Sequence, residues 1–388
     1  MINRLLRREF VARLVLVAVG LLLAPVSGEI ALRIVYADKF GKRPLFYVAD
    51  DTLGYKPNAD LDHTFYGRDF RITMRTDAEG YRLGSLGEVG FDKRLVLLSG
   101  DSNVFGWGVS TDETCASFLD EYLSEISHGG TRVVNLGVGG YGTLQYYVRL
   151  ARFLERHAEA QIPALFVVHA PNDATDNVEA TAYHAGYRQT RDKAPRSRSS
   201  FHMVNFVGYL LRARTHADSL RESPGKQGVI DPYLQDMLFG FEHSHSRRFP
   251  ARIRVGRRSL DLTGVTARDW DVIMTYKRKQ LTRIQRQLAL LSVNLIHDAL
   301  AGRNTTIFHV ILPVAEDWYA LEWSRILKRA APSEGNRVVL LGRYPDVASY
   351  EGELRNAHSG GHFTPAFNRY WAERLAEVLR EHEIVAVP

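Results

Sequence analysis

Three short motifs, far apart in the chain, carry side chains that together suit acyl chemistry. A Gly-Asp-Ser tripeptide ends at Ser102, directly after the apolar run 95–98. A Pro-Asn-Asp tripeptide contains Asn172 and follows the apolar run 165–168, and a late Gly-His pair ends at His362. Serine, asparagine and histidine supply a nucleophile, an oxyanion donor and a general base. The combination predicts chemistry on an ester.

A glycine-rich segment adds a candidate backbone donor. It covers residues 135–142 (Asn-Leu-Gly-Val-Gly-Gly-Tyr-Gly), contains Gly140 and follows a short predicted strand at 133–134. Glycine lets the backbone approach a ligand closely and offer its N–H group. The spacing lacks both the Gly-x-Gly-x-x-Gly fingerprint and the Lys-Ser/Thr pair of phosphate-binding loops. Each motif alone has an ordinary structural reading as a helix cap, a turn or a structural histidine, so the evidence lies in their combination.

Alternating strand and helix patterns begin at residue 94 and predict the scaffold of these motifs. Residues 95–98 form a continuous apolar run, as expected of a buried parallel strand. Further strands are expected at 133–134, 164–168, 306–312 and 338–341, and helices at 115–126, 144–154, 270–301 and from 365 onward. This alternation indicates an α/β domain with a mainly parallel sheet, covering residues 93–388. The carboxyl ends of its strands are the usual ligand edge.

Two further segments interrupt or precede that pattern. Residues 37–92 are predicted to be a small β-rich segment, because 70–74 alternate apolar and polar side chains and a turn follows. Residues 174–268 break the alternation as an insertion. Because they leave the sheet directly after Asn172, we expect a partial lid at the ligand edge. The basic stretch 188–198 is expected to be a solvated loop, with a polyanion-binding rim as the alternative.

Residues 1–36 carry a membrane or targeting signal. Several arginines precede a mostly apolar stretch, Phe10 to Ser27, which is interrupted by Arg13. The uncharged part is shorter than the ~20 residues of a membrane span, so a signal peptide cleaved near Gly28 and a buried core helix remain alternatives. The helical pattern continues to Tyr36, which favours an uncleaved anchor with the N-terminus inside and the bulk of the chain outside.

Composition excludes several functional classes. The chain has 388 residues, 45% of them hydrophobic and 24% charged, which is ordinary for a globular protein. The net charge of +6 comes from dispersed basic residues with no nucleic-acid-binding module, so we expect no nucleic-acid partner. Cys115 is the only cysteine, which excludes an intrachain disulfide and a cysteine-based metal site. We expect no cofactor and no metal ion.

The four motifs, in this order, resemble the four sequence blocks of the SGNH (GDSL-type) hydrolase family. The similar segments are residues 98–109, 135–143, 170–173 and 359–362. The resemblance implies that Ser102 takes the place of the nucleophile and His362 that of the base. It also implies an oxyanion hole made by the backbone of Ser102, the backbone of Gly140 and the side chain of Asn172.

The resemblance further implies a fold, a location and an activity. It implies a three-layer α/β/α sandwich (the flavodoxin-like SGNH fold), preceded by a transmembrane helix and the small β-rich segment. That order is similar to envelope-facing bacterial members, including relatives of the alginate O-acetylation proteins. The implied protein is single-pass in the cell inner membrane and faces the periplasm. It would act as a serine esterase or O-acyltransferase on an acylated carbohydrate or a similar ester.

Two positions depart from the family pattern. Ala170 stands where the third block usually has glycine, and Ser359 stands where the last block usually has aspartate. That aspartate would orient the histidine and stabilise its charged form, whereas Ser359 can hydrogen-bond but supplies no charge. Three outcomes stay open: a Ser–His dyad with Ser359 beside it, recruitment of Asp346 or Glu353, or weak or lost activity. The last outcome corresponds to an alternative function, an inactive SGNH-fold subunit that binds a partner in a membrane complex.

Overall fold

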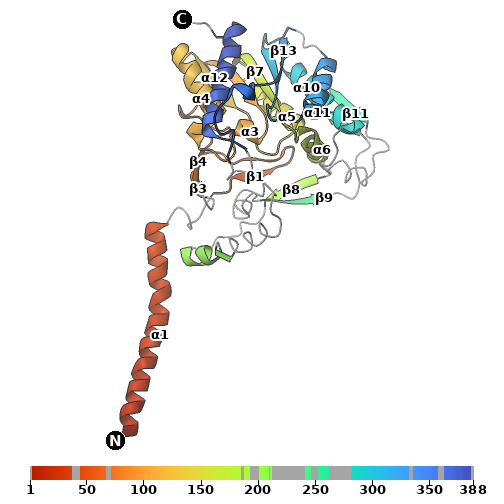
Figure 1. Cartoon of the computed structure of the whole chain (residues 1–388). Coiled ribbons are helices and arrows are strands. Elements are labelled where there is room, and N and C mark those ends of the chain that lie inside the picture. The colour runs from red at the N-terminus through yellow and green to blue at the C-terminus, as the bar shows by residue number, and fades with distance from the viewer. Residues whose placement is uncertain are drawn as a thin grey trace.

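Five parallel strands form the central sheet in the order β13-β12-β7-β5-β6 (Figure 1). They are β5 (Arg94–Ser99), β6 (Thr131–Asn135), β7 (Gln161–His169), β12 (Thr306–Ile311) and β13 (Arg337–Arg343). The predicted α/β fold with a mainly parallel sheet is confirmed. The computed structural model describes residues 2–36, 44–66, 71–184, 188–192, 201–208, 210–211, 241–245, 252–261, 281–331, 335–356 and 362–385.

Helices cover both faces of this sheet, which gives three layers. Leu95 and Leu97 of β5 face a cluster that includes α5 (Thr143–Arg156) and α10 (Arg283–Ala299). Val96 and Leu98 face the opposite cluster, which includes α4 (Cys115–Ile126) and α12 (Pro365–Glu381). Because successive side chains of a strand point to opposite faces and helices cover both, the inner strands β5, β7 and β12 are mostly buried and mostly apolar.

Threonine side chains cap the first turns of α12 and α10 and explain where these helices begin. Thr364 accepts the backbone N–H of Phe367 and Pro365 occupies the first turn, so the predicted start of α12 is confirmed. Thr282 caps α10 in the same way, so this helix begins at Arg283. Residues 270–280 of the helix predicted over 270–301 lie outside the described residues. The helix α11 (Asp317–Arg329) was not predicted.

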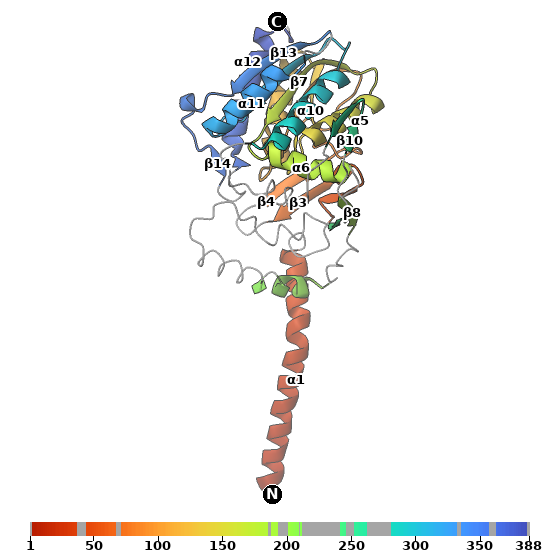
Figure 2. The same cartoon turned by 90° about the vertical axis from the view of Figure 1, so that its right-hand side faces the viewer.

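The N-terminal part consists of one long helix and two small hairpins. Helix α1 (Ile2–Val35) extends away from the domain (Figures 1 and 2). From Glu9 to Val35 it is long and apolar enough to cross a membrane, by length and composition. Strands β1 (Tyr47–Asp50) and β2 (Gly54–Pro57) pair antiparallel, as do β3 (Asp62–Tyr66) and β4 (Arg71–Arg75).

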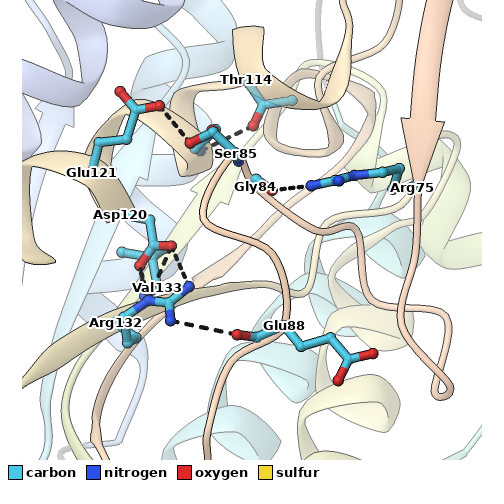
Figure 3. A network of polar contacts seen from close by, with 10 residues as sticks. Arg75, Gly84, Ser85, Glu88, Thr114, Asp120, Glu121, Arg132 and Val133 are labelled. Atoms are coloured by element: carbon cyan, nitrogen blue, oxygen red, sulfur yellow. Dashed lines mark hydrogen bonds and ion pairs between the residues drawn. The ribbon is translucent and has the colours of Figure 1, made fainter. Parts of the chain in front are cut away.

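Polar contacts attach the chain after β4 to the α/β domain (Figure 3). Ser85 donates from its hydroxyl to Glu121 of α4 at 2.5 Å. The buried Asp120 accepts hydrogen bonds from the Arg132 guanidinium and from the backbone N–H of Val133, so it joins α4 to β6. Just before Ser85, Arg82 pairs with Asn135 in an isolated antiparallel bridge, which holds this part of the chain against the edge strand β6.

The insertion is divided between two places. Its first helix, α6 (Asp173–His184), and strand β8 (Arg188–Asp192) begin at the carboxyl edge of the sheet, and β8 pairs with β9 (Phe241–His245). The hairpin of β10 (Arg252–Val255) and β11 (Arg258–Asp261) instead packs along α5 and α10, where Arg258 pairs with Asp298. Helix α6 follows the carboxyl end of β7 closely, and Val255 of β10 packs with Ala180 of α6 as well as with α5 and α10. The position of the insertion at the ligand edge and its lid role stay predictions.

Candidate active site

Ser102 and His362 are in direct contact at the carboxyl edge of the sheet. His362 Nε2 and Ser102 Oγ are 2.7 Å apart, and both side chains are partly exposed. The predicted contact is thus confirmed across 260 positions of sequence. A serine hydroxyl that donates to an imidazole nitrogen has the geometry of a nucleophile beside its base.

Short elements hold each of these two residues. Ser102 begins the helix α3 (Ser102–Phe105), and Asp101 caps it by accepting the Asn103 backbone N–H at 2.9 Å. His362 lies on β15 (His362–Phe363), which pairs with β14 (Arg355–Asn356). The Asn356 side chain donates to the Gly108 carbonyl at 3.4 Å, so β14 also contacts the loop that follows α3.

A buried arginine holds the turn after Ser102. The Arg82 guanidinium donates to the carbonyls of Phe105, Gly106 and Val109 at 2.7, 2.6 and 2.6 Å. Burial lowers the pKa of Arg82 to about 9, which leaves the group charged at neutral pH. Carbonyls at the end of a helix attract a cation, so Arg82 stabilises α3 in the position that presents Ser102.

The glycine-rich loop lies against Ser102 and is supported by two tyrosines. A Cβ placed on Gly139 would lie 3.6 Å from Ser102 Cβ and 3.0 Å from the Tyr47 hydroxyl. Tyr55 donates its hydroxyl to the Gly139 carbonyl at 2.7 Å. Gly140 has φ +75° and is exposed, and a side chain there would be strained and would meet the Tyr55 hydroxyl. The loop thus brings the Gly139–Gly140 backbone beside the nucleophile.

Asn172, the third predicted donor, is oriented by a carboxyl group one helical turn later. Its side-chain amide donates to Asp176 Oδ2 at 2.5 Å. Burial raises the pKa of Asp176 well above its ordinary value. An amide nitrogen carries two hydrogens, so one fixes the side chain on Asp176 and the other stays available for an oxyanion.

A line of buried histidines lies beneath the Asn172 segment. His169 Nε2 is 3.0 Å from His309 Nδ1, His309 Nε2 is 2.9 Å from His297 Nε2, and His297 Nδ1 donates to a backbone carbonyl. Burial lowers the pKa of His169 to about 3 and the pKa of His309 well below its ordinary value, so both rings are neutral. The carbonyl at one end then fixes every tautomer along the line and leaves His169 Nδ1 as an acceptor.

Asp173 stands at the other end of this line. Its Oδ2 lies 3.7 Å from His169 Nδ1, and its Oδ1 accepts the Tyr146 hydroxyl at 2.7 Å. Burial raises the pKa of Asp173 well above its ordinary value. Within the described part of the chain, no group of three or more His, Cys, Asp or Glu side chains is placed to hold a metal ion.

Of the three residues predicted to support His362, the structure describes Asp346 and Glu353. Ser359 lies outside the described residues. Asp346 caps the short helix η2 (Val347–Ser349) by accepting the Ala348 N–H at 3.0 Å, so its carboxylate has a structural use there. Glu353 is exposed, and its backbone carbonyl accepts the Thr364 hydroxyl.

Sequence reasoning missed the residues that orient the site. Arg82 and Tyr55 carry no local pattern that separates them from surface residues, because their partners lie elsewhere in the chain. One signal was present for Asp176: it follows Asn172 by four positions, the spacing at which side chains meet on a helix.

Comparisons with known proteins do not assign a family. No family model matches the chain, and no curated protein matches it either. Among solved structures, TesA is 12% identical with a TM-score of 0.37, covering 74% of this chain and 99% of TesA. A carboxylesterase from Lactobacillus plantarum is 11% identical with a TM-score of 0.24, covering 84% and 98% of the two chains. A lipase/esterase from the same organism is 12% identical with a TM-score of 0.25, covering 84% and 99%. These scores are too low to define a shared fold.

Proposed function

We propose that this protein is a membrane-anchored serine esterase or O-acyltransferase of the SGNH type. Its substrate is an acylated carbohydrate or a similar small ester. The observation that supports the proposal most is the 2.7 Å contact between Ser102 Oγ and His362 Nε2 at the carboxyl edge of the sheet. The glycine loop beside Ser102 and the amide of Asn172 supply donors for an oxyanion.

The reaction follows from these positions. Ser102 Oγ bonds to the ester carbonyl carbon while His362 Nε2 takes the hydroxyl proton. The backbone N–H groups of Ser102 and Gly140 and the amide of Asn172 stabilise the oxyanion. The ester C–O bond then breaks, and the imidazolium returns its proton to the leaving alcohol. Water or a sugar hydroxyl then gives its proton to His362 and bonds to the acyl carbon. The bond from that carbon to Ser102 Oγ breaks, and His362 returns the proton to Ser102 Oγ. The acceptor decides between hydrolysis and transfer.

The location belongs to the same proposal. Helix α1 is the single span of an inner-membrane protein, uncleaved, with the α/β domain on the periplasmic side. Its length and exposure support this, since every residue from Glu9 to Ser27 is exposed. A mature protein that begins at Glu29, found by N-terminal sequencing, would contradict an uncleaved anchor.

The test of activity is turnover of a small activated ester, such as a nitrophenyl acetate, by the purified full-length protein in detergent. Ser102→Ala and His362→Ala should each remove the activity above the uncatalysed rate. Ser324→Ala is the matched control, because that hydroxyl bonds to a carbonyl of its own helix far from the site. A second reaction with added sugar acceptors separates transfer from hydrolysis.

Two results would count against this function. Activity that persists in Ser102→Ala would place the chemistry elsewhere. Folded wild-type protein that neither hydrolyses nor transfers an acyl group would favour the alternative, an inactive subunit with a binding role in a membrane complex.

A further inference from the structure

A second helix crosses the end of α1 nearest the domain. Residues 202–208 and 210–211 are helical and are called the crossing helix below. It is the short green helix beside the upper end of α1 in Figure 1, and it runs across α1 in Figure 2. It belongs to the insertion 174–268, which follows Asn172 of the candidate active site. It therefore joins α1 to the same segment of the chain that begins at that site.

Specific contacts join the two helices. The Glu29 carboxylate accepts the backbone N–H groups of His202 and Met203 at 2.9 and 2.8 Å. These are donors that the first turn of a helix leaves without intrahelical partners. Gly28 allows the close approach, because a Cβ there would lie 2.2 Å from Met203 Cε. Leu32, one turn later on the same face of α1, is buried.

This crossing point lies where a membrane surface would be. The stretch from Phe10 to Ser27 is exposed throughout, and at about 1.5 Å per residue it is about 27 Å long. That length is close to the ~30 Å hydrocarbon thickness of a bilayer. The first covered positions of α1, Gly28 and Glu29, therefore come at the outer boundary of the hydrocarbon.

The crossing helix carries an apolar stripe on its exposed side. Val204, Val207 and Leu211 are 57%, 47% and 64% exposed, and they are three or four positions apart. Phe201 and Leu210 extend the stripe at 60% and 49% exposure. Asn205, on the side away from Val207, is buried. A helix with this pattern is typical of the membrane interface.

We propose that the crossing helix lies in the outer interface of the membrane that α1 spans, with its apolar stripe against lipid. The proposal rests on the membrane-spanning role of α1 given above. Its occupant is the lipid surface and not a second protein, because the crossing helix contacts α1 at Gly28 and Glu29, directly after the exposed apolar stretch of α1 that ends at Ser27. With α1 upright and the crossing helix flat, the orientation of the domain is fixed. The end of the domain that carries β8 and β14 then faces the bilayer (Figure 2).

The test measures how close single sites come to lipid. The one cysteine of the chain is buried, so an added surface cysteine is the reactive thiol for an environment-sensitive fluorophore. The full-length protein is reconstituted in vesicles of phosphatidylcholine and phosphatidylglycerol with a lipid-borne quencher high on the acyl chain. Val207→Cys reports the stripe and Leu21→Cys reports the span. Leu321→Cys is the matched control, a 51% exposed leucine on α11 in the domain.

The expected result is that the labels at positions 21 and 207 lose most of their emission to the lipid-borne quencher. The label at position 321 should lose none and should respond only to an aqueous quencher. A quenched Leu21→Cys with an unquenched Val207→Cys would overturn the inference and leave the anchor in place. A label at position 207 shielded from both quenchers would assign the stripe to a second copy or another protein. If neither label is quenched by lipid, the anchor itself fails.

Discussion

Replacing Arg82 by methionine should loosen the turn that presents Ser102. The change keeps a long side chain but removes the donors from the carbonyls of Phe105, Gly106 and Val109. Each buried carbonyl left without its donor costs about 1–3 kcal/mol, and the loss is partly offset because a buried charge is removed as well. We expect a net destabilisation of about 3–5 kcal/mol, as for breaking a buried ionic contact.

Thermal unfolding in detergent gives a direct measurement of this cost. A domain of about 300 residues has an unfolding entropy of about 0.6 kcal/mol/K, so Arg82→Met should lower the melting temperature by about 5–8 °C. The melting temperature of Arg82→Lys should lie between those of the wild type and Arg82→Met, because an ammonium reaches some of the carbonyls. Arg325→Met is the control: that arginine is 60% exposed on α11, and its loss should shift melting by about 1 °C or less.

The site should respond as well as the stability. Well below the melting temperature, Arg82→Met should react more slowly at Ser102, because α3 is no longer fixed at its end. The reasoning is wrong if Arg82→Met melts within about 1 °C of the wild type. It is also wrong if Arg82→Lys and Arg82→Met are equally destabilised.

Three further outcomes follow from the site. Asp176→Ala should lower turnover by about 5–30-fold, the cost of losing one orienting hydrogen bond to Asn172, whereas Asp176→Asn should keep most of the activity because its oxygen still accepts; equal losses would contradict the positioning role. Asp173 has a raised pKa in the folded protein, so its stabilisation is complete below the unfolded value of 3.8 and is lost as pH rises through the folded value. Asp173→Asn should therefore reduce the loss of stability that sets in as pH rises above 3.8, measured as melting temperature against pH, and an unchanged slope would refute this. Ser359→Asp should raise turnover by supplying a carboxylate three positions before His362, and no change would indicate that another acid already serves.

The strands were predictable where helices bury both faces of the sheet, because such strands must be rich in apolar residues. Strands β5, β7 and β12 are mostly apolar because helices cover both sides of the sheet. Helix α12 was predictable from a threonine cap, a proline and one apolar stripe. Helix α11 was missed although Tyr319, Trp323 and Ile326 are buried at helical spacing, so the signal was present in the sequence.

The nucleophile–base contact was predictable, and its supports were not. Ser102 and His362 each follow a recognisable local motif at an element boundary, so topology alone brings them to one edge. Arg82 and Tyr55 act through backbone carbonyls far along the chain, and only the folded structure shows which carbonyls those are. Gly28 lies at the possible cleavage site, and its close contact with Met203 of the crossing helix is visible only in the folded structure.

The most direct test of the central claim is covalent labelling of the full-length protein with a fluorophosphonate, followed by peptide mapping. The proposed site requires one adduct, on Ser102, because His362 makes that hydroxyl nucleophilic at 2.7 Å. His362→Ala should slow the labelling strongly, and Ser324→Ala should leave it unchanged. Folded wild-type protein that forms no adduct, or forms it on another serine, would contradict the proposed esterase or acyltransferase.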